Sequence, residues 1–161
     1  MNLGDFMKNK KETIMIIIIS IFAFVLDQIT KIIVLKTMNV ADTVHVIKNF
    51  FRISYVQNTG AAWSIFTGSR LFLIATTILI LGLFTYFVIK HEKITKKEQI
   101  IYGVLIGGIL GNLIDRIHLG YVVDFLDFNF GSFDFPVFNL ADVFIVLSGI
   151  ILILQLLKED R

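Results

Sequence analysis

Three aspartates stand at the ends of three long apolar segments, and their placement constrains the fold of this chain more than any other feature. Asp27 follows 13 uncharged residues, Asp115 follows 15, and Asp142 precedes 15. If the segments cross a bilayer in alternating directions, the three carboxylates meet at one depth near one membrane face. Ionisable groups at that depth are costly to bury and mark functional sites. Asp124 lies in a short loop that ends at Asp142, so we expect a paired-aspartate site at a membrane surface.

Composition indicates that lipid surrounds most of the chain. The 161 residues are 56% hydrophobic with a mean hydropathy of +0.80, and 17% are charged, against about 25% in soluble domains. Four stretches approach the roughly 20 apolar residues that cross a hydrocarbon core. They are Ile14–Leu35, Leu71–Ile89, Ile100–Ile117 and Leu140–Leu157. We predict a mainly α membrane protein with four transmembrane helices, forming a single domain over residues 1–161.

The basic residues predict how these helices are oriented. They cluster before the first helix, between the second and third, and after the fourth, as Lys8, Lys10, Lys11, Lys90, Lys93, Lys96, Lys97, Lys158 and Arg161. By the positive-inside rule these segments are cytoplasmic, so both termini lie inside and the aspartates converge at the outer leaflet. The N-terminal lysines could also begin a secretory signal, but the apolar run continues through Asp27 and Lys31 and no A-x-A site follows it. We therefore expect a retained first helix in a multi-pass protein.

The first outer connection, about residues 40–63, is too long for a simple turn. Within it, Val44–Val56 is rich in β-branched and aromatic residues with partial alternation, which predicts short strands. Phe50, Tyr55 and Trp63 are suited to the headgroup level, because aromatic rings favour that interface. We expect a small amphipathic sheet outside the membrane.

A glycine seam and a polar face mark the third apolar segment. Glycines recur there every four residues, at Gly103, Gly107 and Gly111. Such a pattern lets another helix backbone approach closely, and we interpret it as a packing feature. One turn on, Asn112, Asp115 and Arg116 share one helical face. This face favours the wall of a pocket over an Asp115–Arg116 pair that only caps the helix.

Polar pairs also occur in the first and fourth segments. Asp27 and Lys31, spaced i and i+4, are expected to form an ion pair that lowers the cost of burying both. Asn139 and Asp142 open the fourth segment just after Pro136, and Asn139 alone would serve as an N-cap. The cap does not explain Asp142, although the helix dipole favours an acid in a first turn. A purely structural role for Asp142 therefore stays open at this point.

Asp124 is flanked by valine and phenylalanine, and apolar surroundings disfavour its charged form. If Asp124 and Asp142 meet, one pKa rises and the two carboxylates share a proton. In that arrangement one carboxylate takes a proton from water while the other, protonated, polarises a scissile carbonyl. We treat Asp127 and Asp134 as solvated loop acids.

The chain offers few candidate residues for thiol catalysis, for a serine–histidine site or for metal binding. The absence of cysteine excludes disulfides, iron–sulfur clusters and thiol catalysis. His45, His91 and His118 share no metal-ligand spacing and no nearby serine partner, and there is no H-E-x-x-H motif. A net charge of +2 is too small to argue for nucleic acid. We therefore expect no metal, no other cofactor and no nucleic-acid partner.

Five short motifs run through the chain from the first apolar segment to the fourth. They are residues 27–31 (DQITK), 58–63 (NTGAAW), 111–116 (GNLIDR), 122–125 (VVDF) and 138–142 (FNLAD). In this order and with these gaps, they resemble the bacterial lipoprotein signal peptidases, the signal peptidase II family. One motif alone would be weak evidence, whereas the five together are specific.

This resemblance implies a four-helix membrane aspartyl endopeptidase with a small extracytoplasmic β-cradle, in the bacterial cytoplasmic (inner) membrane. The family removes signal peptides from prolipoproteins, cleaving just before a diacylglyceryl-modified cysteine, and needs no metal. Carried over motif by motif, Asp124 and Asp142 are the catalytic pair. The substrate-binding or supporting residues are then Asp27, Lys31, Asn58, Gly60, Asn112, Asp115, Arg116 and Asn139. We expect a monomer whose partners are lipidated prolipoproteins and membrane lipids.

Other functional classes remain open on sequence alone. A proton- or cation-coupled transporter would also place Asp27, Asp115 and Asp142 within a bundle, although neither broken helices nor internal repeats are evident. A membrane scaffold could use the glycine seam to bind a further helix, but it would not need Asp124 beside Asp142. An intramembrane aspartyl protease of the presenilin or prepilin-peptidase kind would carry a Gly-x-Gly-Asp motif, which this chain lacks.

Overall fold

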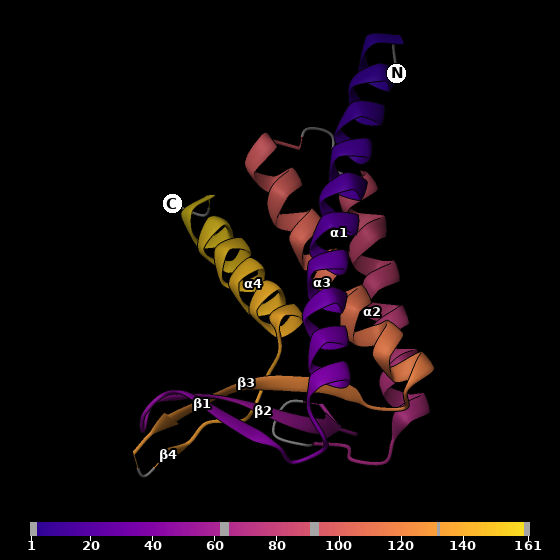
Figure 1. Cartoon of the computed structure of the whole chain (residues 1–161). Helices are drawn as coiled ribbons and strands as arrows, with labels where there is room; N and C mark the ends of the chain where they lie inside the picture. The colour runs from indigo at the N-terminus through magenta and orange to yellow at the C-terminus, as the bar shows by residue number, and fades with distance from the viewer. Residues whose placement is uncertain (1–2, 62–64, 91–93, 132, 160–161) are drawn as a thin grey trace.

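The computed structural model describes residues 3–61, 65–90, 94–131 and 133–159. Its helices are α1 (Leu3–Thr37), α2 (Arg70–Lys90), α3 (Lys96–His118) and α4 (Leu140–Glu159), and its strands are β1 (Thr43–Ile47), β2 (Phe51–Asn58), β3 (Val122–Phe130) and β4 (Phe133–Asp134). The helices form a bundle, and the strands form a sheet across one end of it (Figure 1). Four segments are long and apolar enough to span a membrane, namely Lys11–Thr37, Arg70–Val88, Lys96–His118 and Leu140–Lys158. The predicted fold class is confirmed.

Helix α3 begins before its predicted start because polar residues there satisfy the terminal backbone groups. Thr95 and Glu98 form a capping box: Thr95 Oγ1 accepts the N–H of Glu98 at 3.3 Å, and Glu98 Oε2 accepts the N–H of Thr95 at 2.7 Å. Helix α3 therefore begins at Lys96, one turn before the predicted Ile100. The count of apolar residues reports only the part of each helix that can cross the membrane.

The glycine seam of α3 lets two helices approach on two different faces. A methyl group at Gly103 would lie 2.6 Å from a side-chain carbon of α1, and one at Gly107 would lie 2.6 Å from the carbonyl oxygen of Ser20. A methyl group at Gly108 would instead meet the carbonyl oxygen of Ala141, on α4, at 2.8 Å. These separations leave no room for any side chain, so the packing role of the seam is confirmed.

The strands form one antiparallel sheet in the order β1-β2-β3-β4. The predicted strand segment 44–56 divides into β1 and β2 at a tight turn, where Asn49 adopts a φ of 59°, a left-handed conformation that asparagine tolerates. Strand β2 then pairs with β3, and Val56 stands opposite Asp124 after an irregularity in the register that begins at Ile53. Asp124 therefore lies on a strand, which corrects our prediction of a loop.

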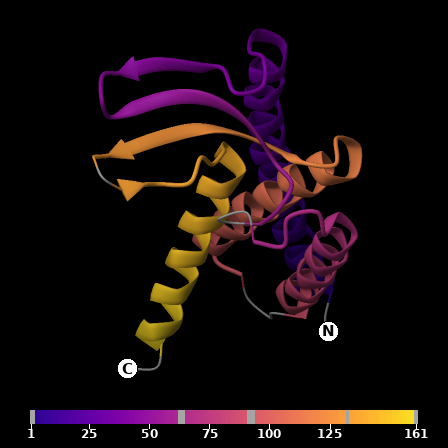
Figure 2. The same ribbon diagram turned by 90° about the horizontal axis from the view of Figure 1, so that it is seen from below.

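Strand β3 joins the sheet to the helices. It packs under α1 in a hydrophobic cluster made by Val34, Tyr55, Val123 and Phe125. At the edge of β3 that does not pair with β2, the carbonyl of Phe138 accepts the N–H groups of Phe125 and Leu126 at 2.9 and 2.7 Å. These bonds hold the segment just before α4 beside β3, an arrangement seen from below in Figure 2. The middle of β3 and the start of α4 thus become neighbours.

The predictions for the outer aromatic residues have mixed outcomes. Phe50 is exposed on the sheet, as an interfacial ring would be. Tyr55 is instead 4% exposed, because its side of β2 faces α1, so its ring packs inside the protein. Trp63 lies outside the described residues.

Gly107→Ala is expected to lower the free energy of unfolding by about 1–3 kcal/mol, the range for overpacking a close contact. The added methyl would overlap the Ser20 carbonyl and the Ala23 side chain of α1. Gly149→Ala on α4 is the matched control, since nothing lies within 4 Å of a methyl there, and alanine's helix preference should leave stability equal or higher. Thermal unfolding in one detergent compares the two variants, and equal midpoints would contradict the packing role of the seam.

Candidate active site

A buried lysine organises the polar residues at the sheet end of the bundle. Lys31 is 1% exposed. Its ammonium lies 2.9 Å from each of three acceptors, Oδ2 of Asp27, Oδ2 of Asp115 and Oδ1 of Asn112. An ammonium carries three N–H donors, so each donor has a partner. The predicted pair of Asp27 and Lys31 is confirmed, and Asp115 shares the same cation.

The two carboxylates also bind groups from other elements. Asp27 Oδ1 accepts the N–H of Ala141, in the first turn of α4, at 2.9 Å, and Asp115 Oδ2 accepts the N–H of Val123, on β3, at 3.2 Å. Gln28 donates to Asp115 Oδ1 at 3.1 Å and to Asp27 Oδ2 at 3.2 Å. We did not predict Gln28 as a site residue. The sequence signal that could have found it is its place beside Asp27 in the first motif.

Asn112 connects this network to Asp142. Because Asn112 Oδ1 accepts from Lys31, its Nδ2 is directed away and donates to Asp142 Oδ1 at 2.7 Å. Asp142 Oδ2 accepts the N–H of Asn139 at 3.2 Å, while Asn139 Oδ1 accepts the N–H of Asp142 at 2.9 Å. This reciprocal pair is a capping box at the start of α4. Asp142 therefore has the structural role that the sequence left open, in addition to its contact with Asn112.

Asn139 also binds the second aspartate of the expected pair. Its Nδ2 donates to Asp124 Oδ1 at 2.6 Å and to Asn112 Oδ1 at 3.1 Å. Asp124 Oδ2 accepts from Asn58 at 2.9 Å, since Asn58 stands diagonally across the β2–β3 ladder on the same face. Asp124 and Asp142 are thus linked through one residue, although they come from a strand and a helix.

The surroundings of Asp124 adjust its acidity. Burial raises the pKa of Asp124 to about 7, and the negative charge of Asp142 acts in the same direction. The amides of Asn58 and Asn139 oppose this shift, because a donor stabilises the ionised carboxylate. Asp124 therefore gains and loses its proton near neutral pH, where a general acid or base is most effective.

Arg116 lies beside the aspartates and is hydrogen-bonded to backbone groups. Its Nη2 donates to the carbonyl of Gly60 at 2.9 Å, and its Nη1 donates to the carbonyl of Asn112 at 3.3 Å. Its Nε is buried and has no hydrogen-bond partner in the described part of the chain. Asp115 is directed toward Lys31 instead, so there is no Asp115–Arg116 cap. Of the three residues expected to form a pocket wall, Asn112 and Arg116 line the cavity.

Asp127 is not the solvated loop acid that we predicted. It is buried on β3 and accepts from Arg52 Nη2 at 2.9 Å and from Ser54 Oγ at 2.6 Å. Burial alone would raise the pKa of Asp127, but these two hydrogen bonds outweigh it and hold the pKa below its ordinary value. The contact forms because the sheet register places Arg52 opposite Asp127. The side chain of Asp134 lies outside the described part of the structure.

A cavity of about 900 Å³ opens beside the two aspartates. Its polar lining includes Asn58, Thr59, Asn112, Arg116, Asp124 and Asp142. Its apolar wall includes Val56, Phe135, Pro136, Val143, Val146 and Leu147. Over residues 3–61, 65–90, 94–131 and 133–159, no group of three or more His, Cys, Asp and Glu side chains could hold a metal ion.

Two amide-linked aspartates, one on β3 and one in the first turn of the membrane-spanning α4, lie beside an apolar cavity, as expected for a membrane enzyme of the aspartyl class. A family model described as signal peptidase (SPase) II matches residues 19–158. Lipoprotein signal peptidases of Staphylococcus aureus strains JH9 and Newman are each 42% identical over 143 residues, covering 89% of this chain and 88% of theirs. The chain belongs to the signal peptidase II family, which confirms the resemblance.

Two solved structures, both described as bacterial membrane enzymes, share the fold. The first has a TM-score of 0.84 and 40% identity, and the match covers 91% of this chain and 89% of that one. The second has a TM-score of 0.80 and 41% identity, and the match covers 89% of this chain and 92% of that one. The arrangement of four helices and a small sheet is therefore common to these chains.

Lys31→Met is expected to reduce the free energy of unfolding by about 3–5 kcal/mol, because it leaves Asp27 and Asp115 buried without their shared cation. Lys36→Met is the matched control, since Lys36 is exposed near the end of the same helix, and its effect should stay within about 0.5 kcal/mol. Unfolding in the same detergent measures both variants. A Lys31→Met protein as stable as the Lys36→Met protein would show that the ammonium does not hold the fold together.

Proposed function

We propose that this chain is an aspartyl endopeptidase that removes signal peptides from prolipoproteins, cleaving before the diacylglyceryl-modified cysteine. The observation that carries the proposal is Asn139, which hydrogen-bonds to both Asp124 and Asp142 beside a cavity of about 900 Å³. The relatives named as lipoprotein signal peptidases support the same substrate class.

In the proposed reaction the two aspartates share one proton. Asp124, with its raised pKa, is the protonated partner and gives its proton to the scissile carbonyl oxygen. Asp142, held by Asn112 and by the backbone of Asn139, takes a proton from the attacking water. The water oxygen bonds to the carbonyl carbon and forms a tetrahedral gem-diol. Collapse breaks the C–N bond as Asp142 gives its proton to the leaving amine and Asp124 recovers its own.

Arg116 is placed to hold the substrate and not to perform the chemistry. Its two terminal nitrogens are fixed by the carbonyls of Gly60 and Asn112. Each terminal nitrogen carries a second N–H, so Arg116, which lines the cavity, can still donate to a substrate carbonyl at the cavity wall. A guanidinium presents its donors in one rigid plane, so it would fix the orientation of a peptide group beside the pair.

The apolar wall of the cavity suits a substrate that stays in the membrane. Val146 and Leu147 line it, yet they are 56% and 55% exposed. The cavity therefore opens sideways at the surface of α4, whose residues Leu140–Lys158 can span the bilayer. An apolar signal peptide and the acyl chains of a lipidated cysteine can reach the aspartates by this route without entering water.

We also infer that both termini are cytoplasmic and that the site lies at the outer leaflet. Five described lysines support this, because they gather at the end of the bundle away from the sheet. They are Lys11, Lys90, Lys96, Lys97 and Lys158.

Asp124→Asn and Asp142→Asn are each expected to reduce turnover by at least about 10²-fold, since an amide cannot take or share a proton. The double variant should be little worse than either single one, because the two residues act as a unit. Asp127→Asn is the matched control: it is another buried aspartate on β3, but it binds Arg52 and Ser54. It should keep its turnover.

The assay for these variants follows cleavage of a diacylglyceryl-modified precursor in membranes free of the native enzyme, with an unmodified precursor alongside. Full cleavage by either site variant would exclude the aspartyl mechanism. Equal cleavage of the two precursors would retain the mechanism and exclude the proposed lipid dependence.

Activity is expected to fall as the pH rises through about 7, because Asp124 loses its proton there. Asn58→Leu removes a donor that stabilises the ionised carboxylate, so the pKa of Asp124 should rise and the alkaline limb should move to higher pH. Gln57→Leu is the matched control, since Gln57 donates to Tyr55 and not to Asp124. The pH dependence of kcat/KM measures both, and a limb that Asn58→Leu moves to lower pH would contradict the assignment.

The orientation predicts which side chains an impermeant thiol reagent reaches in intact cells. Lys48→Cys, at the turn between β1 and β2, should be labelled, whereas Lys96→Cys, at the start of α3, should react only after permeabilisation. Both positions are exposed, and the chain has no cysteine of its own. The opposite labelling pattern would place the site on the cytoplasmic side.

A further inference from the structure

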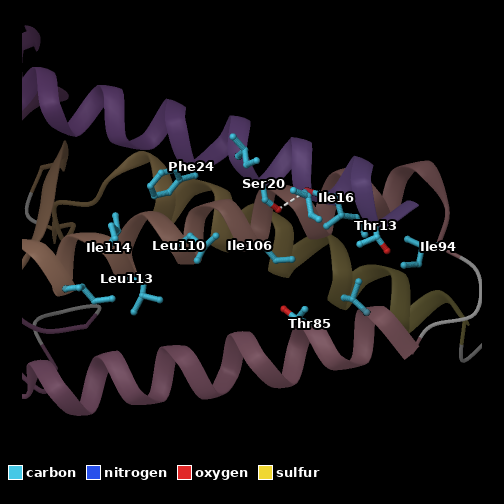
Figure 3. Close-up of a pocket in the computed structure, with 14 residues that line it drawn as sticks. Thr13, Ile16, Ser20, Phe24, Thr85, Ile94, Ile106, Leu110, Leu113 and Ile114 are labelled. Atoms are coloured by element: carbon cyan, nitrogen blue, oxygen red, sulfur yellow. Dashed lines mark hydrogen bonds between the residues drawn. The ribbon is translucent and has the colours of Figure 1, made fainter. Parts of the chain in front are cut away.

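A second cavity lies between α1, α2 and α3, apart from the aspartates. It has a volume of about 580 Å³. Figure 3 shows its lining side chains along α1 and α3, with Thr85 of α2 opposite them. On α3 it is lined by residues such as Leu110 and Ile117, whereas the aspartate cavity is lined by Asn112 and Arg116. At 3.6 residues per turn these sets lie on different faces of α3, so this α1–α2–α3 groove is a separate feature.

Contacts at both ends of α2 keep the groove open. Arg70, the first residue of α2, donates to two carbonyls in the last turn of α3 at 2.7 Å each. At the other end, Ile16 of α1, Val88 of α2 and Ile94, just before α3, form a buried cluster against which Tyr102 and Ile106 of α3 pack. Helix α2 is therefore fixed at its two ends, and the space between them cannot close by a simple shift of the helix.

The lining of the groove suits hydrocarbon and not water. Three of its lining residues carry a hydroxyl group, namely Thr13, Ser20 and Thr85, and Ser20 already donates to the carbonyl of Ile16 at 2.8 Å (Figure 3). A buried water needs two to four polar partners. Ile17 and Ile21 line the groove yet are 50% and 57% exposed, so it opens sideways within the membrane-spanning part of α1. A lipid acyl chain is the occupant that this lining favours.

Positive charge lies at one end of the groove. Three exposed lysines each stand two residues from a lining residue, at the bundle end that faces the chain termini: Lys11, Lys90 and Lys96. Lys90 Nζ lies 5.2 Å from the ring centre of Tyr86, a cation–π contact. Of the acids described at this end, Glu12 is buried and Glu98 is engaged in the capping box. The exposed charge there is therefore mainly positive.

We propose that the α1–α2–α3 groove binds an anionic phospholipid, with one acyl chain in the groove and the phosphate headgroup among Lys11, Lys90 and Lys96. Each basic residue near an anionic headgroup should strengthen binding about fivefold. The lipid binds only the folded bundle, so it should also raise the unfolding temperature. Its acyl chain would contact α2 at Thr85 and Val88, which line the groove.

Native mass spectrometry of the full-length protein tests the proposal. The probes are phosphatidylglycerol and phosphatidylcholine with identical palmitoyl and oleoyl chains. The wild type should retain phosphatidylglycerol preferentially, and Lys→Gln at positions 11, 90 and 96 together should remove the preference. Lys→Gln at positions 36, 48 and 158 is the matched control, because it removes the same charge from other exposed sites and should leave the preference intact.

Filling the groove tests the acyl site independently of charge. Thr85→Trp, or Ile106→Phe from α3, should abolish retention of phosphatidylglycerol with all three lysines present. Ile80→Trp, on the exposed side of α2, should retain it, and unfolding midpoints establish that each variant is folded. Equal retention of the two lipids by the wild type would overturn the headgroup site. Undiminished retention of phosphatidylglycerol by a folded groove-filled variant would overturn the groove.

Discussion

The ammonium of Lys31 is the interaction on which the rest of the structure depends. Its three hydrogen bonds, each 2.9 Å long, join Asp27 of α1 to Asp115 and Asn112 of α3. The same carboxylates accept backbone N–H groups from α4 and β3. Charges at this depth in a membrane are tolerated when they are paired. One cation therefore fixes two helices directly, and a third helix and a strand through its partners.

Neutral amides separate this cation from Asp124 and Asp142, the proposed catalytic pair. Asp124 receives hydrogen bonds from Asn58 and Asn139, and Asp142 receives one from the side chain of Asn112. A lysine in direct contact would hold the pKa of Asp124 low, whereas here the pKa of Asp124 rises to about 7. The amides thus fix the positions of Asp124 and Asp142 relative to Lys31, while its positive charge makes no direct contact with either carboxylate. This arrangement reconciles a rigid, charge-stabilised fold with a carboxyl group that titrates near neutrality.

Most of the fold follows from local sequence, whereas two features of the site do not. The apolar runs predict the four helices, and the i and i+4 spacing predicts the Asp27–Lys31 pair. The five motifs indicate the family. The strand position of Asp124 depends on the pairing of β3 with β2, in which Val56 stands opposite Asp124. The burial of Asp127 depends on the β2–β3 register, which an irregularity after Ile53 sets. Strand partners and register are long-range properties, and residue spacing along one strand does not encode them.

Helix α2 stands outside the charged network, and this difference explains where the bundle is open. The other three helices are joined by carboxylates, amides and glycine contacts, so their backbones approach closely. Helix α2 is held by the Arg70 bonds at one end and by a hydrophobic cluster at the other, where Phe84 and Tyr102 are in ring contact. In a bilayer, apolar surfaces gain little from meeting each other, because lipid tails are equally apolar. The polar bonds hold the aspartates in place, while the apolar helix leaves a groove that hydrocarbon can fill at little cost.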